Sequence, residues 1–171
     1  MTPPRAAPPE PRAPARRREL AAVVIRPAAE RDRAAIEALV AGVAAEVYGH
    51  LFRGDPARPE GNWARGLLAE LDARVVGVVV ADDGWIEDLW VAADCRRGGL
   101  GRRLLSAGEA QIAAAGHRLG YLRVVAENHG ARRFYARCGW SEVETYPHEK
   151  WGFEMVDMVK PVRRARGASE A

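Results

Sequence analysis

The stretch Trp85–Leu105 constrains the fold of this chain more than any other. It joins an apolar segment over residues 85–91, a basic segment with glycine at 98, 99 and 101, and a leucine-rich segment. This order predicts a buried strand, a tight loop and the start of a helix. A glycine-rich loop before a helix gathers free backbone N–H groups around one point, so we interpret the stretch as a phosphate cradle.

Three kinds of glycine loop share this plan, and the spacing separates them. The dinucleotide-binding fingerprint needs a third glycine where this chain has Leu104, and the P-loop needs a Gly-Lys-Ser/Thr end that is absent. What remains is Arg-x-x-Gly-x-Gly, formed by Arg96, Gly99 and Gly101 after a strand that reads Glu-Asp-Leu-Trp-Val. This pattern resembles the acyl-CoA pyrophosphate loop of the GNAT superfamily of N-acetyltransferases.

A second motif follows over residues 128–140. It resembles the superfamily pattern Asn-x-x-Ala-x-x-Phe-Tyr-x-x-x-Gly-Phe, with Trp140 in place of the usual phenylalanine. The matching residues are Asn128, Ala131, Phe134, Tyr135 and Gly139. The two motifs stand in the expected order and separation and together cover residues 85–140, which makes the pair a specific signal, whereas either motif alone would be a moderate one.

The remaining pattern predicts one α/β (α+β) domain of the GNAT type. Apolar runs predict strands over 22–26, 67–71, 74–81, 85–91, 121–126, 141–146 and 153–159. Helical periodicity predicts helices over 33–48, 100–115 and 128–138, with Asp32 as an N-cap and Gly49 as a stop, and the irregular segment 50–63 has room for a short fourth helix. Strand, loop, helix and strand over 85–126 form a crossover, so strands 85–91 and 121–126 should be parallel within a mixed, mostly antiparallel sheet of six or seven strands, flanked by about four helices.

The ends of the chain differ in charge from its body. Residues 1–22 and residues 160–171 each carry a net charge of +3, so the body between them carries −3. We expect a disordered Pro/Arg-rich tail over 1–21, an N-acetyltransferase domain over 22–160 and a basic disordered tail over 161–171. A mildly acidic body argues against nucleic acid as a partner, and no apolar run approaches the roughly 20 residues that span a membrane.

The two cysteines carry no motif. Cys95 and Cys138 form neither a metal-binding nor a disulfide pattern, so we expect no metal and a reducing, cytoplasmic setting. Cys95 lies beside the glycine loop, but no histidine is placed near it by the sequence. Direct transfer in a ternary complex is therefore favoured over a covalent acyl-cysteine.

The resemblance implies acetyl-CoA as the co-substrate, bound without a metal. Loop amides from Arg97 to Arg102 would meet the pyrophosphate, the strand backbone would pair with the pantetheine arm, and Asn128 would hydrogen-bond that arm. The expected cofactor-binding residues are Leu89, Trp90, Val91, Arg96, Arg97, Gly98, Gly99, Leu100, Gly101, Arg102, Asn128 and Tyr135.

The expected catalytic residues are Glu87 and Tyr135. By the resemblance, Tyr135 would protonate the departing thiolate, although helical periodicity alone would also place it in a core stripe. The strand is similar to that of the spermidine/spermine N-acetyltransferases, in which the glutamate is the proposed base, so we favour Glu87 as proton acceptor, directly or through water. A regular strand would point the Asp88 side chain to the face opposite Glu87. Asp88 could instead cap a turn or bind the amine.

The predicted function is transfer of an acetyl group from acetyl-CoA to a primary amine, with a small molecule favoured. A metabolite, a polyamine and an aminoglycoside-like amine all stay open. Acetylation of a protein N-terminus or lysine is the alternative within this fold, and a non-catalytic acyl-CoA-binding module is the alternative of another class. The superfamily's frequent dimers leave a homodimer open.

Segments 50–63 and 146–152 are expected to face the acceptor, although neither carries a motif. Four aromatic residues expected near the site offer a wall for an organic cation, or else pack in the core. They are Trp85, Trp90, Tyr146 and Trp151.

Overall fold

The computed structural model describes residues 20–51, 61–150 and 152–163. The strands are β1 (Val24–Pro27), β2 (Leu67–Leu71), β3 (Arg74–Asp82), β4 (Trp85–Val91), β5 (Leu119–Val125), β6 (Ser141–Pro147) and β7 (Glu154–Pro161). The α-helices are α2 (Arg33–Tyr48), α3 (Leu100–Ala114) and α4 (His129–Arg137). The tails expected over 1–21 and 161–171 lie largely outside the described residues.

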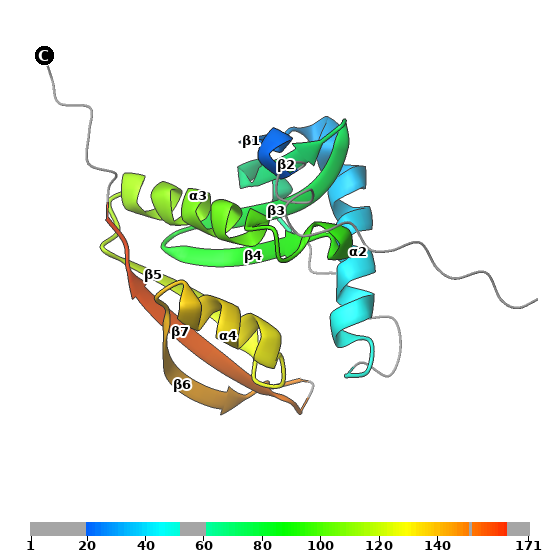
Figure 1. Cartoon of the computed structure of the whole chain (residues 1–171). Coiled ribbons are helices and arrows are strands. Elements are labelled where there is room, and N and C mark those ends of the chain that lie inside the picture. Colours follow the sequence, from blue (N-terminus) through cyan, green and yellow to red (C-terminus); the bar gives the residue numbers. More distant parts are fainter. Residues whose placement is uncertain (1–19, 52–60, 151, 164–171) are drawn as a thin grey trace, which may run out of the picture.

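The seven strands form one mixed sheet in the order β1-β2-β3-β4-β5-β7-β6 (Figure 1). β4 and β5 are parallel, and every other neighbouring pair is antiparallel. The predicted fold class and the predicted parallel pair are therefore confirmed.

The described residues hold three α-helices rather than about four. The short helix expected within 50–63 falls mostly outside the described residues, and the part inside them forms only a 3-10 turn at Trp63–Arg65. Further 3-10 turns occupy Leu20–Ala22, Glu30–Asp32 and Ala93–Cys95.

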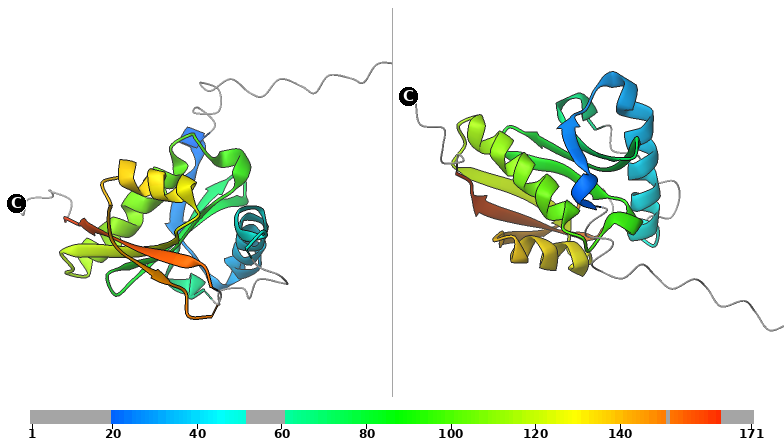
Figure 2. Two further views of the ribbon diagram at one scale, coloured as in Figure 1. Left: turned by 90° about the horizontal axis from the view of Figure 1, so that it is seen from below. Right: turned by 45° about the horizontal axis from the view of Figure 1, so that its top comes forward.

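Helices α2 and α3 cover opposite faces of the half of the sheet whose last strand is β4. Val78 and Val80 of β3 pack with Ile36 and Val40 of α2, whereas Val79 packs in the cluster that contains the α3 side chains. A Cβ at Gly108 of α3 would lie within 3.0 Å of side chains from both β3 and β4, so glycine allows this helix to lie close to the sheet. Figure 2 shows α2 on the side of the sheet away from α3 and α4.

The start of α2 differs from the expectation. Asp32 stands at the N-cap position, but its carboxylate caps no helix amide. It accepts instead from the Arg26 guanidinium at 2.8 and 2.9 Å and from the Ala29 backbone N–H at 2.8 Å. Arg26 also binds Glu70 of β2 at 2.6 Å, so a charged partner has displaced the cap and joins β1, β2 and α2.

The end of α2 also differs in detail. Gly49 is the C-cap as expected, but its φ of −55° is helical rather than left-handed. The helix therefore ends in a turn in which the Leu51 backbone N–H donates to the Tyr48 carbonyl at 2.9 Å.

β4 and β5 separate soon after they begin. Their pairing is limited to Trp85 with Tyr121 and Ile86 with Leu122, after which β4 pairs with β3 alone and β5 with β7 alone. Figure 1 shows the two strands running apart toward the side on which α2 ends. Residues 87–91 thus have no partner strand on the β5 side, in the middle of the sheet.

Candidate functional site

The space between the separating strands is a cleft of about 740 Å³. Its walls come from the end of α2, from β4, the glycine loop and the start of α3, and from β5 and the length of α4. The predicted site residues that line it are Glu87, Leu89, Trp90, Val91, Arg96, Arg97, Gly99, Gly101, Arg102, Asn128 and Tyr135. Residues from two motifs are thus brought together around one cavity.

Gly98 and Leu100 do not line the cleft. A Cβ at Gly98 would meet the Leu20 side chain, and the Leu100 side chain is 1% exposed in the core. These two positions can offer a ligand only their backbone groups.

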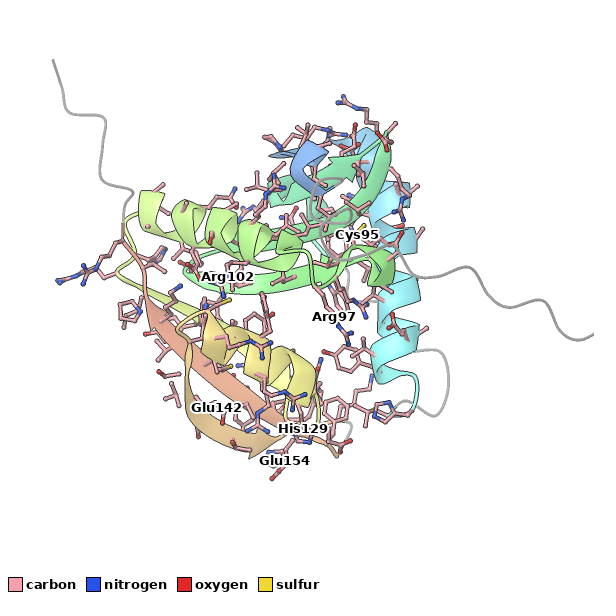
Figure 3. All side chains as sticks on the ribbon, viewed as in Figure 1. Cys95, Arg97, Arg102, His129, Glu142 and Glu154 are labelled. Atoms are coloured by element: carbon pink, nitrogen blue, oxygen red, sulfur yellow. The ribbon has the colours of Figure 1, made fainter. Side chains whose placement is uncertain are left out.

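The glycine loop presents backbone amides to the cleft. Arg97 and Gly99 take left-handed conformations, with φ of 64° and 90°. The first amide bonded within the helix is that of Arg103, which donates to the Gly99 carbonyl at 3.1 Å, so the amides of the first turn have no acceptor within α3. Such a turn suits a phosphate group, and Figure 3 shows Arg97 and Arg102 on the side of the loop and α3 that faces α4.

Arg96 has a different role from its neighbours. Its guanidinium forms an ion pair with Glu46 of α2, at 2.8 and 3.0 Å, and donates to the Val91 carbonyl at 3.0 Å. These contacts hold the loop against β4 and α2. A direct contact from Arg96 to a phosphate stays a prediction.

Asn128 begins α4 as its cap. Its Oδ1 accepts from the Ala131 backbone N–H at 3.0 Å, as expected for an Asn N-cap. Its Nδ2 donates to the Tyr48 hydroxyl at 2.9 Å, a contact that the sequence did not predict. The amide nitrogen therefore faces the cleft, where it could also donate a hydrogen bond to a ligand.

Tyr135 projects from α4 into the cleft, with its ring against Phe134 and Trp140 at centroid distances of 5.2 and 6.4 Å. Burial raises the pKa of its phenol, and the nearby Tyr48 and Asp88 groups add to this rise. The phenol therefore holds its proton at neutral pH, as a proton donor must, while the raised pKa makes it a weaker acid than a free tyrosine.

Two adjacent carboxylates lie on the β4 wall. Val80 pairs with Asp88 and Ala81 with Ile86, so Glu87 is the extra residue of a β-bulge and the two side chains need not alternate as in a regular strand. Loss of hydration raises the pKa of Glu87, and the charges of Asp88 and Asp82 raise it further. Burial raises the pKa of Asp88, which accepts from the Trp90 indole N–H at 2.7 Å.

Comparison with models of known protein families identifies the family to which the chain belongs. The model of the Acetyltransferase (GNAT) family matches residues 45–140, more than half of the 171 residues. The chain belongs to the GNAT acetyltransferase family. A search of curated protein sequences found no match.

Solved GNAT structures have the same fold. The ribosomal-protein-alanine N-acetyltransferase of Brucella melitensis is 20% identical, with a TM-score of 0.67, and the match covers 81% of this chain and 99% of that chain. For yncA of Salmonella typhimurium, solved with its cofactor acetyl-CoA, the identity is 17%, the TM-score 0.66 and the coverage 88% and 99%. For nourseothricin acetyltransferase the identity is 20%, the TM-score is 0.63, and the match covers 82% of this chain and 99% of that chain.

In this GNAT domain the aromatic residues do not form one wall. The guanidinium of Arg123 of β5 lies over the rings of both Trp85 and Tyr146, at 5.4 and 5.3 Å from their centroids, and binds Asp157 at 2.8 Å. Trp90 lies in a separate cluster with α2, and Trp151 is outside the described residues.

Sequence reasoning missed four polar residues that line the GNAT cleft, namely Tyr48, Arg123, Arg133 and Arg137. Arg133 and Arg137 are four residues apart in α4, so helical spacing could have placed them on one face. Tyr48 is eight residues after Val40 on the apolar face of α2, a spacing that could have marked it. Arg123 carried no such signal.

No helix in the described ranges is long and apolar enough to cross a bilayer. In the same ranges, no group of three His, Cys, Asp or Glu side chains could hold a metal ion.

Proposed function

We propose that this GNAT domain moves an acetyl group from acetyl-CoA to a primary amine of a small molecule. The observation that carries the proposal is the unpaired edge of residues 87–91, which borders the same cleft as the free amides at the start of α3. An extended arm that carries amides can add to such an edge as a strand does, while its phosphates meet the helix start.

The residues present fit that ligand. Glycine at 99 has open space around its Cα and a φ that other residues avoid, and Gly101 keeps only ordinary contact distances of 3.5 Å or more. The exposed Arg97, Arg102 and Arg133 stand where negative phosphates need partners. We propose that the pantetheine arm lies along Leu89–Val91 and reaches Asn128.

The chemistry needs a neutral amine. An alkyl ammonium with a pKa of about 10.4 is mostly protonated at pH 7, so a carboxylate of raised pKa must take a proton before or during attack. We assign this to Glu87, with Asp88 beside it to attract the cation. The amine nitrogen then attacks the thioester carbonyl carbon, and as the C–S bond breaks the Tyr135 hydroxyl gives its proton to the sulfur. The nitrogen loses its second proton as the amide forms, and this proton returns to the Tyr135 oxygen through water.

A covalent acyl-cysteine is not supported. Cys95 is 3% exposed and is not among the residues that line the cleft. Burial raises the pKa of its thiol, which opposes the thiolate that such a nucleophile requires. Both cysteines are free, which supports our proposal that the enzyme works in the reducing cytoplasm.

Contacts between α2 and the opposite walls favour a small acceptor. Glu46 holds Arg96 and Tyr48 holds Asn128, so the end of α2 narrows the approach to β4. Glu87 and Asp88 make the β4 wall of the remaining approach acidic, which suits a cationic amine.

The proposal is tested by thiol release from acetyl-CoA with a panel of amines. The panel contains a polyamine, an aminoglycoside, an amino acid and a basic peptide with a free N-terminus. We expect release above background with a small cationic amine and a mass gain of one acetyl group on it. Release with the peptide alone would move the function to protein acetylation. Background release with every amine, while CoA still raises the melting temperature, would leave a non-catalytic binding module.

A further inference from the structure

Tyr48 connects both walls of the cleft from a helix that carries neither motif. Its ring meets Trp90 of β4 edge-on, at a centroid distance of 6.2 Å and an angle of 87°. Its hydroxyl accepts from Asn128 Nδ2 at 2.9 Å. One phenol thus contacts residues from the strand and from the helix cap that are predicted to hold the pantetheine arm.

The direction of the hydrogen bond between Asn128 and Tyr48 follows from the cap. Because Oδ1 of Asn128 accepts from the Ala131 N–H, this side chain can offer Tyr48 only its Nδ2, which is a donor. The Tyr48 oxygen is therefore the acceptor, and its own proton is directed elsewhere. In the described part of the chain the hydroxyl makes this one hydrogen bond. A half-buried O–H donor of this kind needs an acceptor from water or a ligand.

Tyr48 lines the same cleft as Tyr135 and Glu87, the residues proposed to act on the sulfur and on the amine. Burial raises the pKa of Tyr48, so it keeps its proton at neutral pH. The Tyr48 phenol adds to the rise in the Tyr135 pKa that burial causes. The proposed function already assigns the neighbouring groups, because Tyr135 donates to the sulfur and the carboxylates accept a proton from the amine. The group left without a side-chain donor is the thioester carbonyl oxygen.

We propose that Tyr48 is a further catalytic residue, whose hydroxyl, oriented by Asn128, donates a hydrogen bond to the carbonyl oxygen of the acetyl thioester. This inference rests on the proposed function. When the amine nitrogen bonds to the carbonyl carbon, the C=O π electrons move to the oxygen, and Tyr48 stabilises that charge without giving up its proton. The electron pair returns to re-form C=O as the C–S bond breaks.

Tyr48→Phe tests the proposal, because it keeps the ring against Trp90 and removes only the hydroxyl. We expect kcat to fall about 100-fold at saturating acetyl-CoA, the loss typical of one oxyanion donor. By calorimetry the affinity for acetyl-CoA should fall about 5-fold, while that for CoA, which has no acetyl carbonyl, should stay unchanged. Equal losses of affinity for the two ligands, or an unchanged kcat, would overturn the assignment.

Asn128→Asp provides a second variant. Aspartate can still cap α4 at Ala131, but it presents an acceptor to Tyr48 and so captures the phenol proton. It should lower kcat strongly in the wild-type background and only weakly in the Tyr48→Phe background. Independent, additive losses would contradict the proposal.

Tyr121→Phe is the matched control, since Tyr121 is a half-buried tyrosine that does not line the cleft. Melting temperatures show whether each variant is folded. A wild-type protein that releases no thiol with any amine would remove the proposed function. The difference between acetyl-CoA and CoA affinities would still test whether Tyr48 meets the acetyl carbonyl.

Discussion

The two sides of the cleft are built by different means. On the side that we propose to hold the cofactor, the glycine loop and the first turn of α3 offer backbone amides, supported by exposed arginines at positions 97, 102, 133 and 137. The side that we propose to face the acceptor consists of side chains from separate elements, with Tyr48 from α2, Glu87 and Asp88 from β4 and Arg123 from β5. One side is basic and offers backbone amides, and the other carries two carboxylates and one arginine on side chains from separate elements.

This difference reflects what each side has to recognise. Backbone amides at a helix start suit any phosphate, and they require glycine at fixed spacing, so such recognition is visible in a sequence. Side chains that converge from distant segments can be exchanged one at a time without loss of the fold. The acceptor can therefore vary within one architecture while the acyl donor stays the same.

The largest effect is expected at Gly99. Gly99→Val forces a β-branched residue to a φ of 90° at the helix start, so CoA binding should be lost in calorimetry. Gly116→Val is the matched control, because Gly116 has a φ of 98° and open space at the other end of α3. Both variants should lose about 1–3 kcal/mol of stability, but only the first should lose CoA. Retained binding in Gly99→Val would rule out the phosphate cradle.

Tyr135→Phe should have the next largest effect. Removal of the proton donor should lower kcat about 100- to 1000-fold with little change in CoA affinity, measured by steady-state kinetics and calorimetry. A wild-type kcat would reduce Tyr135 to a packing residue.

Glu87→Gln tests the side proposed to face the acceptor. Because the pKa of Glu87 is raised, the wild-type kcat/KM should increase with pH as this carboxylate loses its proton, and a base is active only in that form. The variant should lose about 10- to 100-fold at pH 7, and this limb of the pH profile should disappear. Asp88→Asn is the matched comparison. If it, rather than Glu87→Gln, removes the limb, Asp88 is the base.

The smallest effect is expected at Arg97. Arg97→Ala should weaken CoA binding about 5-fold at low salt, and less as salt screens the charge. Arg118→Ala makes the same charge change at an exposed residue that does not line the cleft. If the two variants weaken binding equally, the overall charge matters and the loop position does not.

Much of the fold follows from local sequence patterns. The strand bounds agree to within a few residues because apolar runs and turns are local, and Asn128 was identifiable as a cap because it bonds a residue three positions on. The contact between Asn128 and Tyr48 spans 80 residues and that between Arg96 and Glu46 spans 50, so no spacing reports them. The bulge at Glu87 depends on pairing with β3, which the sequence of β4 alone does not contain.

Asp32 and the aromatic residues show a second limit. Where a side chain has several suitable partners, the three-dimensional arrangement decides which of them it binds. The Asp32 carboxylate binds the Arg26 guanidinium rather than the amides of α2, and this contact holds its pKa well below the usual range. Trp85 and Tyr146 likewise enclose Arg123 rather than open space for a ligand.

The separation of β4 from β5 has a consequence for the lifetime of the protein. It leaves two unpaired strand edges at the centre of the sheet, and such edges are templates for aggregation that most proteins keep short or covered. A bound acyl-CoA would cover these edges and stabilise the native state by mass action. If the cleft binds acyl-CoA as proposed, the solubility of this protein and its resistance to proteolysis should therefore follow the supply of acyl-CoA in the cell.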